Sequence, residues 1–182
     1  MKKIFILLLC IFSYHASSDE RQPYTAEDRE PCSIYVKDRM PLFGDLHVHT
    51  ALSLDAHTQG TLNTPDDAYR YAKGQSLFLQ PYKEDGTSSR ISKLKQPLDF
   101  AAVTDHAELL GEVRLCTDPE SQKYNSLQCK TYRNFPKLSY FYMNAKASMR
   151  KPLGICGENR ENCLDAAQLP WEETIDAAEQ HY

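Results

Sequence analysis

The sequence predicts an α/β protein in which two core strands lie parallel and side by side. Residues 44–50 alternate polar and apolar side chains, and residues 98–103 form a short apolar run, as strands do. Between them, residues 64–74 carry the start and stop signals of a helix. A strand, a helix and a second strand form a right-handed βαβ unit by default.

The first strand carries the most informative side chains of the chain. Alternate residues of a strand face the same side, so Asp45, His47 and His49 project together, with neighbours about 7 Å apart. Leu46 and Val48 point the other way, into packing. Two imidazoles on a rigid strand can bind the same metal ion, or each can bind one of two neighbouring metal ions. The alternative is a pair of surface or core histidines.

The helix that follows has clear start and stop signals. Thr64 is a candidate N-cap, Pro65 fits the first helical position, and Asp66 and Asp67 suit the positive end of the helix dipole. Gly74 ends the helix. Its apolar face consists of Ala68, Tyr71 and Ala72.

A hairpin is predicted between the helix and the second core strand. Residues 76–79 and 90–94 are candidate strands, and residues 84–87 form a turn signal between them. The length of this insertion makes it a candidate rim over an active site. The alternative is a disordered loop.

The second core strand ends as the first one does, in histidine and aspartate. His49 and Asp55 follow the first strand, and Asp105 and His106 follow the second. In parallel α/β folds the chemistry lies at the carboxyl ends of the strands. Two such endings in one chain favour a metal site over structural histidines.

These stretches resemble a known superfamily. Asp-Leu-His-Val-His-Thr at 45–50, followed by Thr-Asp-His at 104–106, is similar to motifs one and two of the PHP (polymerase and histidinol phosphatase) metal-dependent hydrolases. The longer strings 44–56, 64–70 and 97–108 resemble a secreted bacterial branch of that superfamily whose function is unknown. The resemblance covers residues 43–112 most strongly. It implies a distorted (β/α)7 barrel, two or three clustered metals, and phosphoester hydrolysis as the commonest activity.

The resemblance assigns roles to single residues by motif position. Asp45 and Asp105 are adjacent carboxylates that orient imidazoles or bridge to metal. The candidate metal ligands are His47, His49, Asp55, His106 and, by bridging, Asp45.

Asp105 and Glu108 are the candidate catalytic carboxylates, although Glu108 could equally cap the next helix. His57 lies on the same loop as Asp55, and we expect it to stay off the metal. His181 is expected at the surface.

The rest of the chain reads as helices and loops. A short helix is predicted over residues 108–114. Residues 116–129 are predicted to form a polar loop, and residues 154–162 another loop. Residues 137–150 predict a helix that packs one apolar face, formed by Leu138, Phe141, Tyr142, Ala145 and Met149. A last helix starts near Pro170, with Trp171, Ile175, Ala178 and Tyr182 on one face.

Two core strands and three or four helices cannot close a barrel. We therefore expect residues 41–182 to be an incomplete, N-terminal portion of the PHP-type barrel, from a longer protein or a truncated gene product. The alternative is a complete small α/β domain of unusual shape.

The start of the chain predicts export. Lys2 and Lys3 precede an apolar run over residues 4–12, and Ala16-Ser17-Ser18 offers a cleavage site, so residues 1–18 form a signal peptide. Residues 19–40 form an N-terminal arm. The apolar run is shorter than the roughly 20 residues that span a bilayer, and Leu9 before Cys10 argues against a lipoprotein anchor. We expect a periplasmic protein without a stable membrane anchor.

Five of the six cysteines remain after cleavage, and export permits disulfides. Proximity pairs Cys116 with Cys129 and Cys156 with Cys163, although spacing alone does not fix connectivity. Zinc ligation is the competing interpretation, disfavoured because none of the four lies in a Cys-x-x-Cys pair. Cys32 is left over.

The net charge and the motifs present argue against nucleic-acid and nucleotide binding. The formal charge of −4 becomes −6 when Lys2 and Lys3 are removed, so the chain carries no electrostatic footprint for nucleic acid. No glycine-rich phosphate loop is present. Imidazole and carboxylate ligands suit zinc, manganese or iron.

Three functions remain open. The first is an exported metal-dependent hydrolase that acts on a phosphoester, or a related ester, of a small molecule. The second is an amidohydrolase, which likewise carries His-x-His after its first strand; the Thr-Asp-His ending favours the first. The third is a catalytically incomplete metal-binding fragment.

Overall fold

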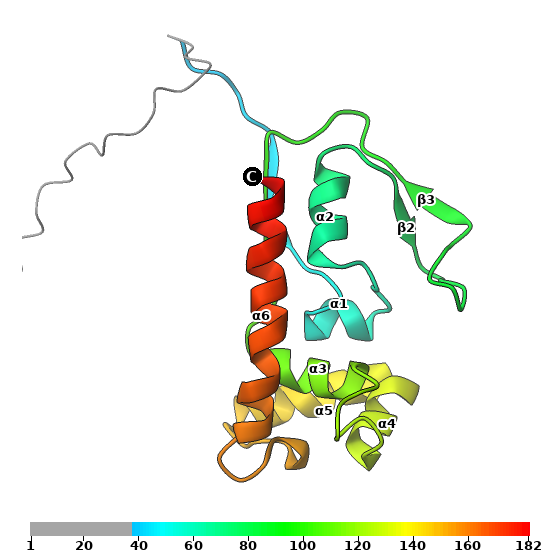
Figure 1. Cartoon of the computed structure of the whole chain (residues 1–182), viewed down its shortest axis with the longest axis vertical. Helices are drawn as coiled ribbons and strands as arrows, with labels where there is room; N and C mark the ends of the chain where they lie inside the picture. The colour runs from blue at the N-terminus through cyan, green and yellow to red at the C-terminus, as the bar shows by residue number, and fades with distance from the viewer. Residues whose placement is uncertain (1–37) are drawn as a thin grey trace, which may run out of the picture. The chain divides into compact units, whose positions relative to one another are not determined.

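The two predicted core strands pair in parallel in the computed structural model of the chain (Figure 1). Strand β1 (Gly44–Val48) lies beside β4 (Phe100–Val103), with Gly44 opposite Phe100. The register shifts between Asp45 and Val48, where three steps along β1 match two along β4. The predicted parallel pairing is confirmed, and it carries the ends of both strands to the same edge.

The structure describes residues 38–182. The predicted signal peptide, most of the predicted arm at residues 19–40, Cys10 and Cys32 lie outside the described residues. Residues 41–182 form one compact unit.

Helix α2 (Pro65–Ala72) forms as its end signals predict. The Thr64 hydroxyl accepts from the Asp67 backbone N–H, and the Asp67 carboxylate accepts from the Thr64 N–H, which completes a capping box. Gly74 follows the helix at φ +86°, a left-handed conformation that glycine adopts without strain. The helix lies between the two strand pairs (Figure 1).

The predicted hairpin is also confirmed. Strand β2 (Leu77–Leu79) pairs antiparallel with β3 (Arg90–Ser92), and Gly86 turns the chain between them. Tyr71 of α2 contacts the hairpin through a 2.8 Å hydrogen bond to the Ser92 hydroxyl.

The remaining elements are helical. Helix α1 lies directly after β1, and the others follow β4 in chain order. Their bounds are α1 (Leu54–Thr58), α3 (Leu110–Thr117), α4 (Leu127–Asn134), α5 (Pro136–Ser148), the 3-10 helix η1 (Gly154–Cys156) and α6 (Glu161–His181).

Both predicted disulfides are present and buried. Cys116–Cys129 joins α3 to α4, and Cys156–Cys163 joins η1 to α6. The sulfurs lie in the main core cluster together with Tyr132. Disulfides of this kind fit an oxidising compartment.

The architecture is a mixed α/β domain with two small two-stranded sheets. Within residues 38–182 the strands close no barrel. In the same range, no helix combines the length and apolarity needed to cross a membrane.

The prediction that Leu46 packs inward is wrong, because Leu46 is 65% exposed. Strand β1 pairs on one side only, and among the described residues no element covers the face that Leu46 presents. Val48 is half-buried beside Val103.

The predicted packing face of α5 is wrong as well. Ser139 and Met143 are buried, whereas Leu138, Phe141, Tyr142, Ala145 and Met149 are exposed. The helix is apolar on more than one side, so periodicity alone could not choose the face. Tyr140 and Ala147 complete the side that contacts the core cluster.

Helix α6 begins nine residues before the predicted start at Pro170 and continues through that proline. Proline removes one main-chain hydrogen bond from a helix interior, and burial of its ring here opposes that loss. The predicted apolar face with Trp171 and Ile175 is exposed, and Cys163, Pro170 and Ala177 are buried instead.

His181 is not the surface residue that the sequence suggested. Its Nε2 lies 2.8 Å from Asp66 Oδ1, and its ring stacks on Tyr69. The contact joins the end of α6 to the first turn of α2, a pairing that no local pattern reveals.

Gly111 allows α3 to approach α6 closely. A Cβ at this position would lie 1.8 Å from the carbonyl oxygen of Cys163, which is backbone and cannot rotate away. The packing of these two helices therefore requires glycine here.

We predict that Gly111→Ala lowers the free energy of unfolding by about 2–3 kcal/mol, because the two helix backbones must separate. Urea denaturation followed by circular dichroism measures the change. Gly154→Ala is the matched control, since its new Cβ would meet only Gln128 Oε1 at 3.5 Å. Equal effects of the two substitutions would contradict the packing argument.

Candidate metal centre

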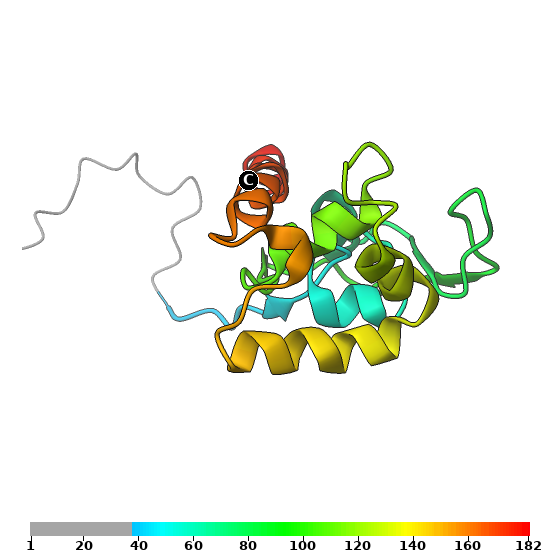
Figure 2. The same cartoon turned by 90° about the horizontal axis from the view of Figure 1, so that it is seen from below.

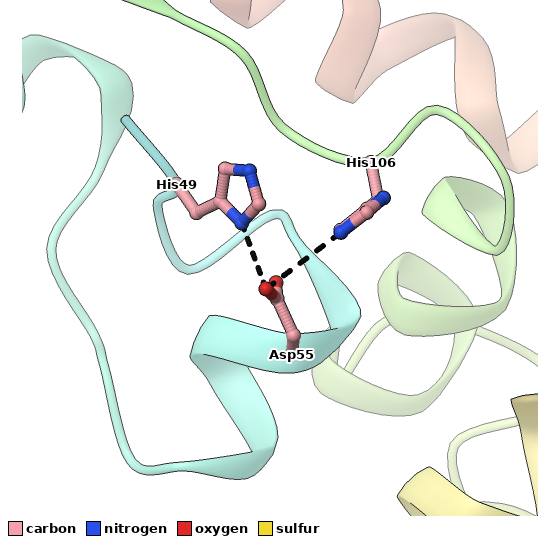
Figure 3. A group of neighbouring side chains, drawn as sticks. All are labelled: His49, Asp55 and His106. Carbon is pink, nitrogen blue, oxygen red and sulfur yellow. Dashed lines mark hydrogen bonds and ion pairs between the residues drawn. The ribbon is translucent and has the colours of Figure 1, made fainter. Parts of the chain in front are cut away.

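Three side chains converge where β1 and β4 end. His49 follows β1, Asp55 lies in the first turn of α1, and His106 follows β4 (Figure 3). One ligand atom from each lies within 4.8 Å of the others. Two of the predicted side chains, His49 and His106, therefore come from the ends of the two paired strands, and α1 adds Asp55.

Asp55 is at the centre of the group. Its Oδ2 lies 2.8 Å from His49 Nδ1 and 3.7 Å from His106 Nε2 (Figure 3). Partial burial alone would raise the pKa of Asp55. Hydrogen bonds from Ser53, His49 and the Ala56 N–H outweigh burial and bring the pKa below its ordinary value. The carboxylate is thus held in its charged form.

Glu108 lies beside the far nitrogen of His106. Its Oε1 is 2.9 Å from His106 Nδ1, while His106 Nε2 lies 3.7 Å from Asp55. Glu108 makes no cap to α3, where no side-chain cap bond is present.

Asp105 holds the chain that follows β1. Its two oxygens accept from the Thr50 N–H at 2.5 Å and from the Thr50 hydroxyl at 2.6 Å. Burial raises the pKa of Asp105, against the lowering effect of both Thr50 bonds. Asp105 is absent from the three-residue group, and in this structure it orients the loop that carries His49 toward Asp55.

Ser53 is a residue that the sequence analysis missed. It is fully buried, and its hydroxyl donates to Asp55 Oδ1 at 2.6 Å. Ser53 Oγ also accepts from the His106 N–H at 3.1 Å. One hydroxyl therefore joins the ends of both strands. Thr50 was missed too. The available signal was two small hydroxyl residues between His49 and Asp55.

His47 and Asp45 lie beside the group. The His47 ring centroid is 4.8 Å from that of His49, and the His47 side chain is exposed. Asp45 Oδ1 accepts from the His47 backbone N–H at 2.9 Å. Both remain predicted ligands. The structure places the His47 ring next to the group, whereas the Asp45 carboxylate bonds to the backbone of β1.

His57 turns away from the group. Its Nδ1 lies 2.9 Å from the Tyr132 hydroxyl, and the two rings stack. Burial lowers the pKa of His57 and raises that of Tyr132, so both stay neutral near pH 7. His57 thus links α1 to α4.

The donor set fits a divalent cation. Zinc–nitrogen and zinc–oxygen bonds of about 2.1 Å at a tetrahedral angle place two ligand atoms about 3.4 Å apart. The 3.7 Å separation between His106 Nε2 and Asp55 Oδ2 is close to that value, whereas His49 Nδ1 lies at hydrogen-bond distance from Asp55 Oδ2, 2.8 Å away. Two imidazoles and a carboxylate suit zinc, manganese or iron.

A second convergence of ligand-type side chains does not offer a metal site. Glu112 lies beside Cys156 and Cys163, all three buried. The two sulfurs are joined in a disulfide and carry no thiolate to bind a metal. Burial raises the pKa of Glu112, whose Oε1 lies 3.7 Å from Arg160.

A cavity of about 470 Å³ lies beside His49, the one member of the group that lines it. His49 and Asp45 line it together with α2, β4 and Leu77 and Leu79 of the hairpin. The hairpin thus borders the space next to the candidate centre, as a rim would.

The fold and this group of side chains define a mixed α/β domain with a histidine–carboxylate cluster at the ends of a parallel strand pair. Residues 36–182 match the family described as "Protein of unknown function (DUF3604)", and the chain belongs to that family. No curated protein and no solved structure matches the chain.

We predict that Ser53→Ala lowers the free energy of unfolding by about 1–3 kcal/mol, because two hydrogen bonds of the buried Ser53 hydroxyl are lost, one from the His106 N–H and one to Asp55. The substitution also raises the pKa of Asp55, which loses a hydrogen bond to its charged form. Urea denaturation and an NMR titration of the carboxyl carbon measure the two effects.

Ser148→Ala, at an exposed position, is the control and should change stability by less than about 0.5 kcal/mol. An unchanged Asp55 pKa in the Ser53 variant would contradict the hydrogen-bond assignment.

Proposed function

We propose that the chain is the metal-binding part of an exported, PHP-type metal-dependent hydrolase that cleaves phosphoesters of small molecules. The observation that carries the proposal is the group of His49, Asp55 and His106 at the ends of two parallel strands. The motif resemblance supplies the reaction class. The N-terminal pattern and the two disulfides support export.

Some residues of the site would bind the metal ions, and others would orient these ligands. His49, Asp55 and His106 would hold the first cation, and His47 lies close enough to His49 to help hold a second one. When bound, such cations supply Lewis acidity and activate water as a nucleophile. Metal identity remains zinc, manganese or iron, with two or three ions in a PHP-type site.

The carboxylates around the ligands fix their geometry. Glu108 lies 2.9 Å from His106 Nδ1 and would orient the ring, and Asp105 sets the path of the loop after His49. Such partners of ligating side chains commonly change metal affinity 10–100-fold when removed. Asp105 and Glu108 are therefore proposed as positioning residues, which refines their assignment as catalytic carboxylates.

We predict that His49→Ala combined with His106→Ala removes bound zinc, manganese or iron from the purified protein, since two of three ligands are lost. Metal analysis by mass spectrometry measures the content per chain. Hydrolysis of p-nitrophenyl phosphate and bis-p-nitrophenyl phosphate by the wild-type protein falls at least 100-fold in the variant or on treatment with a chelator.

His181→Ala is the matched control, because His181 also contacts an aspartate but lies outside the group. Unchanged metal content in the double variant would overturn the metal assignment. Metal-dependent cleavage of amides without phosphoesters would favour the amidohydrolase. Metal binding without turnover of either class would favour an incomplete metal-binding fragment.

A further inference from the structure

The segment that contains α4 and α5 has a charge opposite to that of the chain. Between Ser121 and Gly157 there are seven lysines and arginines and no aspartate or glutamate, in a chain with a net charge of −4. The net charge of this segment is therefore positive, unlike that of the whole chain. This segment also holds the exposed apolar side chains of α5.

The outer face of α5 is defined by Leu138, Phe141, Tyr142 and Met149 at its C-cap. Phe141 is 70% exposed and Leu138 is 63% exposed. Figure 2 shows α5 along one edge of the domain, with its length open to one side. Contiguous exposed apolar side chains of this kind mark an interaction surface.

Two lysines flank the outer face. Residues of an α-helix are turned about 100° from one to the next, so Lys137 and Lys146, nine positions apart, lie on opposite sides of the helix. The stripe of Leu138, Phe141 and Tyr142 lies between them. The Lys146 ammonium is 5.8 Å from the centre of the Tyr142 ring, so its stem runs beside the apolar stripe.

The charge of the segment favours an anionic bilayer over a protein as the partner, because seven basic residues without an acidic one attract acidic headgroups. Tyrosine is common at the membrane interface, where lysines beside it can contact these headgroups. An apolar hollow of about 320 Å³, lined in part by Leu138, Tyr142 and Leu127, opens beside the stripe and can accept apolar groups.

We propose that the outer face of α5 docks reversibly on the surface of an anionic lipid bilayer. The apolar side chains enter the interface, and Lys137 and Lys146 contact acidic headgroups on either side. The contact is peripheral and independent of the proposed metal site, and its cations make it sensitive to salt.

Vesicle co-sedimentation tests the proposal, using the chain from Asp19 because the apolar run before it would partition into lipid by itself. Vesicles of phosphatidylglycerol and phosphatidylcholine in equal parts are compared with pure phosphatidylcholine. We expect binding to the mixed vesicles at low salt and at least tenfold weaker binding to the neutral ones. Leu138→Asp with Phe141→Asp, and separately Lys137→Glu with Lys146→Glu, reduce binding at least tenfold.

Matched controls carry the same change of charge at other exposed sites. Trp171→Asp with Ile175→Asp alters exposed apolar residues of α6, and Lys93→Glu with Lys95→Glu alters exposed lysines after β3. Both controls are expected to retain binding within about twofold, and circular dichroism checks that every variant is folded.

Three outcomes would overturn the proposal. The first is absence of binding to the mixed vesicles. The second is equal loss of binding in the α5 variants and the controls. The third is a dimer by analytical ultracentrifugation that the α5 substitutions convert to monomer without any vesicle binding, which would assign the face to a second copy of the chain.

Discussion

The parallel pairing of β1 with β4 is the constraint on which the rest of the domain depends. The two strands are separated by more than fifty residues, and their pairing alone brings His49 and His106 to one edge. Asp105 and Ser53 then join the two strand ends through side-chain hydrogen bonds. A short ladder is thus completed by polar side chains, and the same side chains fix the candidate ligands.

The helical half of the domain is held differently, by close backbone approach and by disulfides. Gly111 lets α3 contact α6, while the cystines attach α4 to α3 and η1 to α6. Small domains bury a limited apolar core, and cross-links reduce the entropy of their unfolded chains. The core cluster accordingly contains four cysteines among its eleven buried members.

Local signals in the sequence were sufficient for the strand pair, the capped helix α2, the hairpin and the disulfides. They failed where an element is apolar on several sides or where tertiary contacts outweigh propensity. The period of α5 could not distinguish Met143, which is buried, from Phe141, which is exposed, and Pro170 is tolerated inside α6 because it is buried. In the site, histidines and carboxylates stood out, whereas Ser53 acquires its role only when His106 folds against it.

Helix α1 shows how the orientation of one candidate ligand is set from a distance. Five residues form little more than one helical turn, which is far below the length at which a helix is stable alone. The rotation of α1 about its own axis is therefore set by its neighbours, and Tyr132 fixes it by stacking on His57 and hydrogen bonding to it. Tyr132 lies one helical turn beyond Cys129 in α4. The orientation of the Asp55 carboxylate therefore depends on a helix that the Cys116–Cys129 disulfide holds in place.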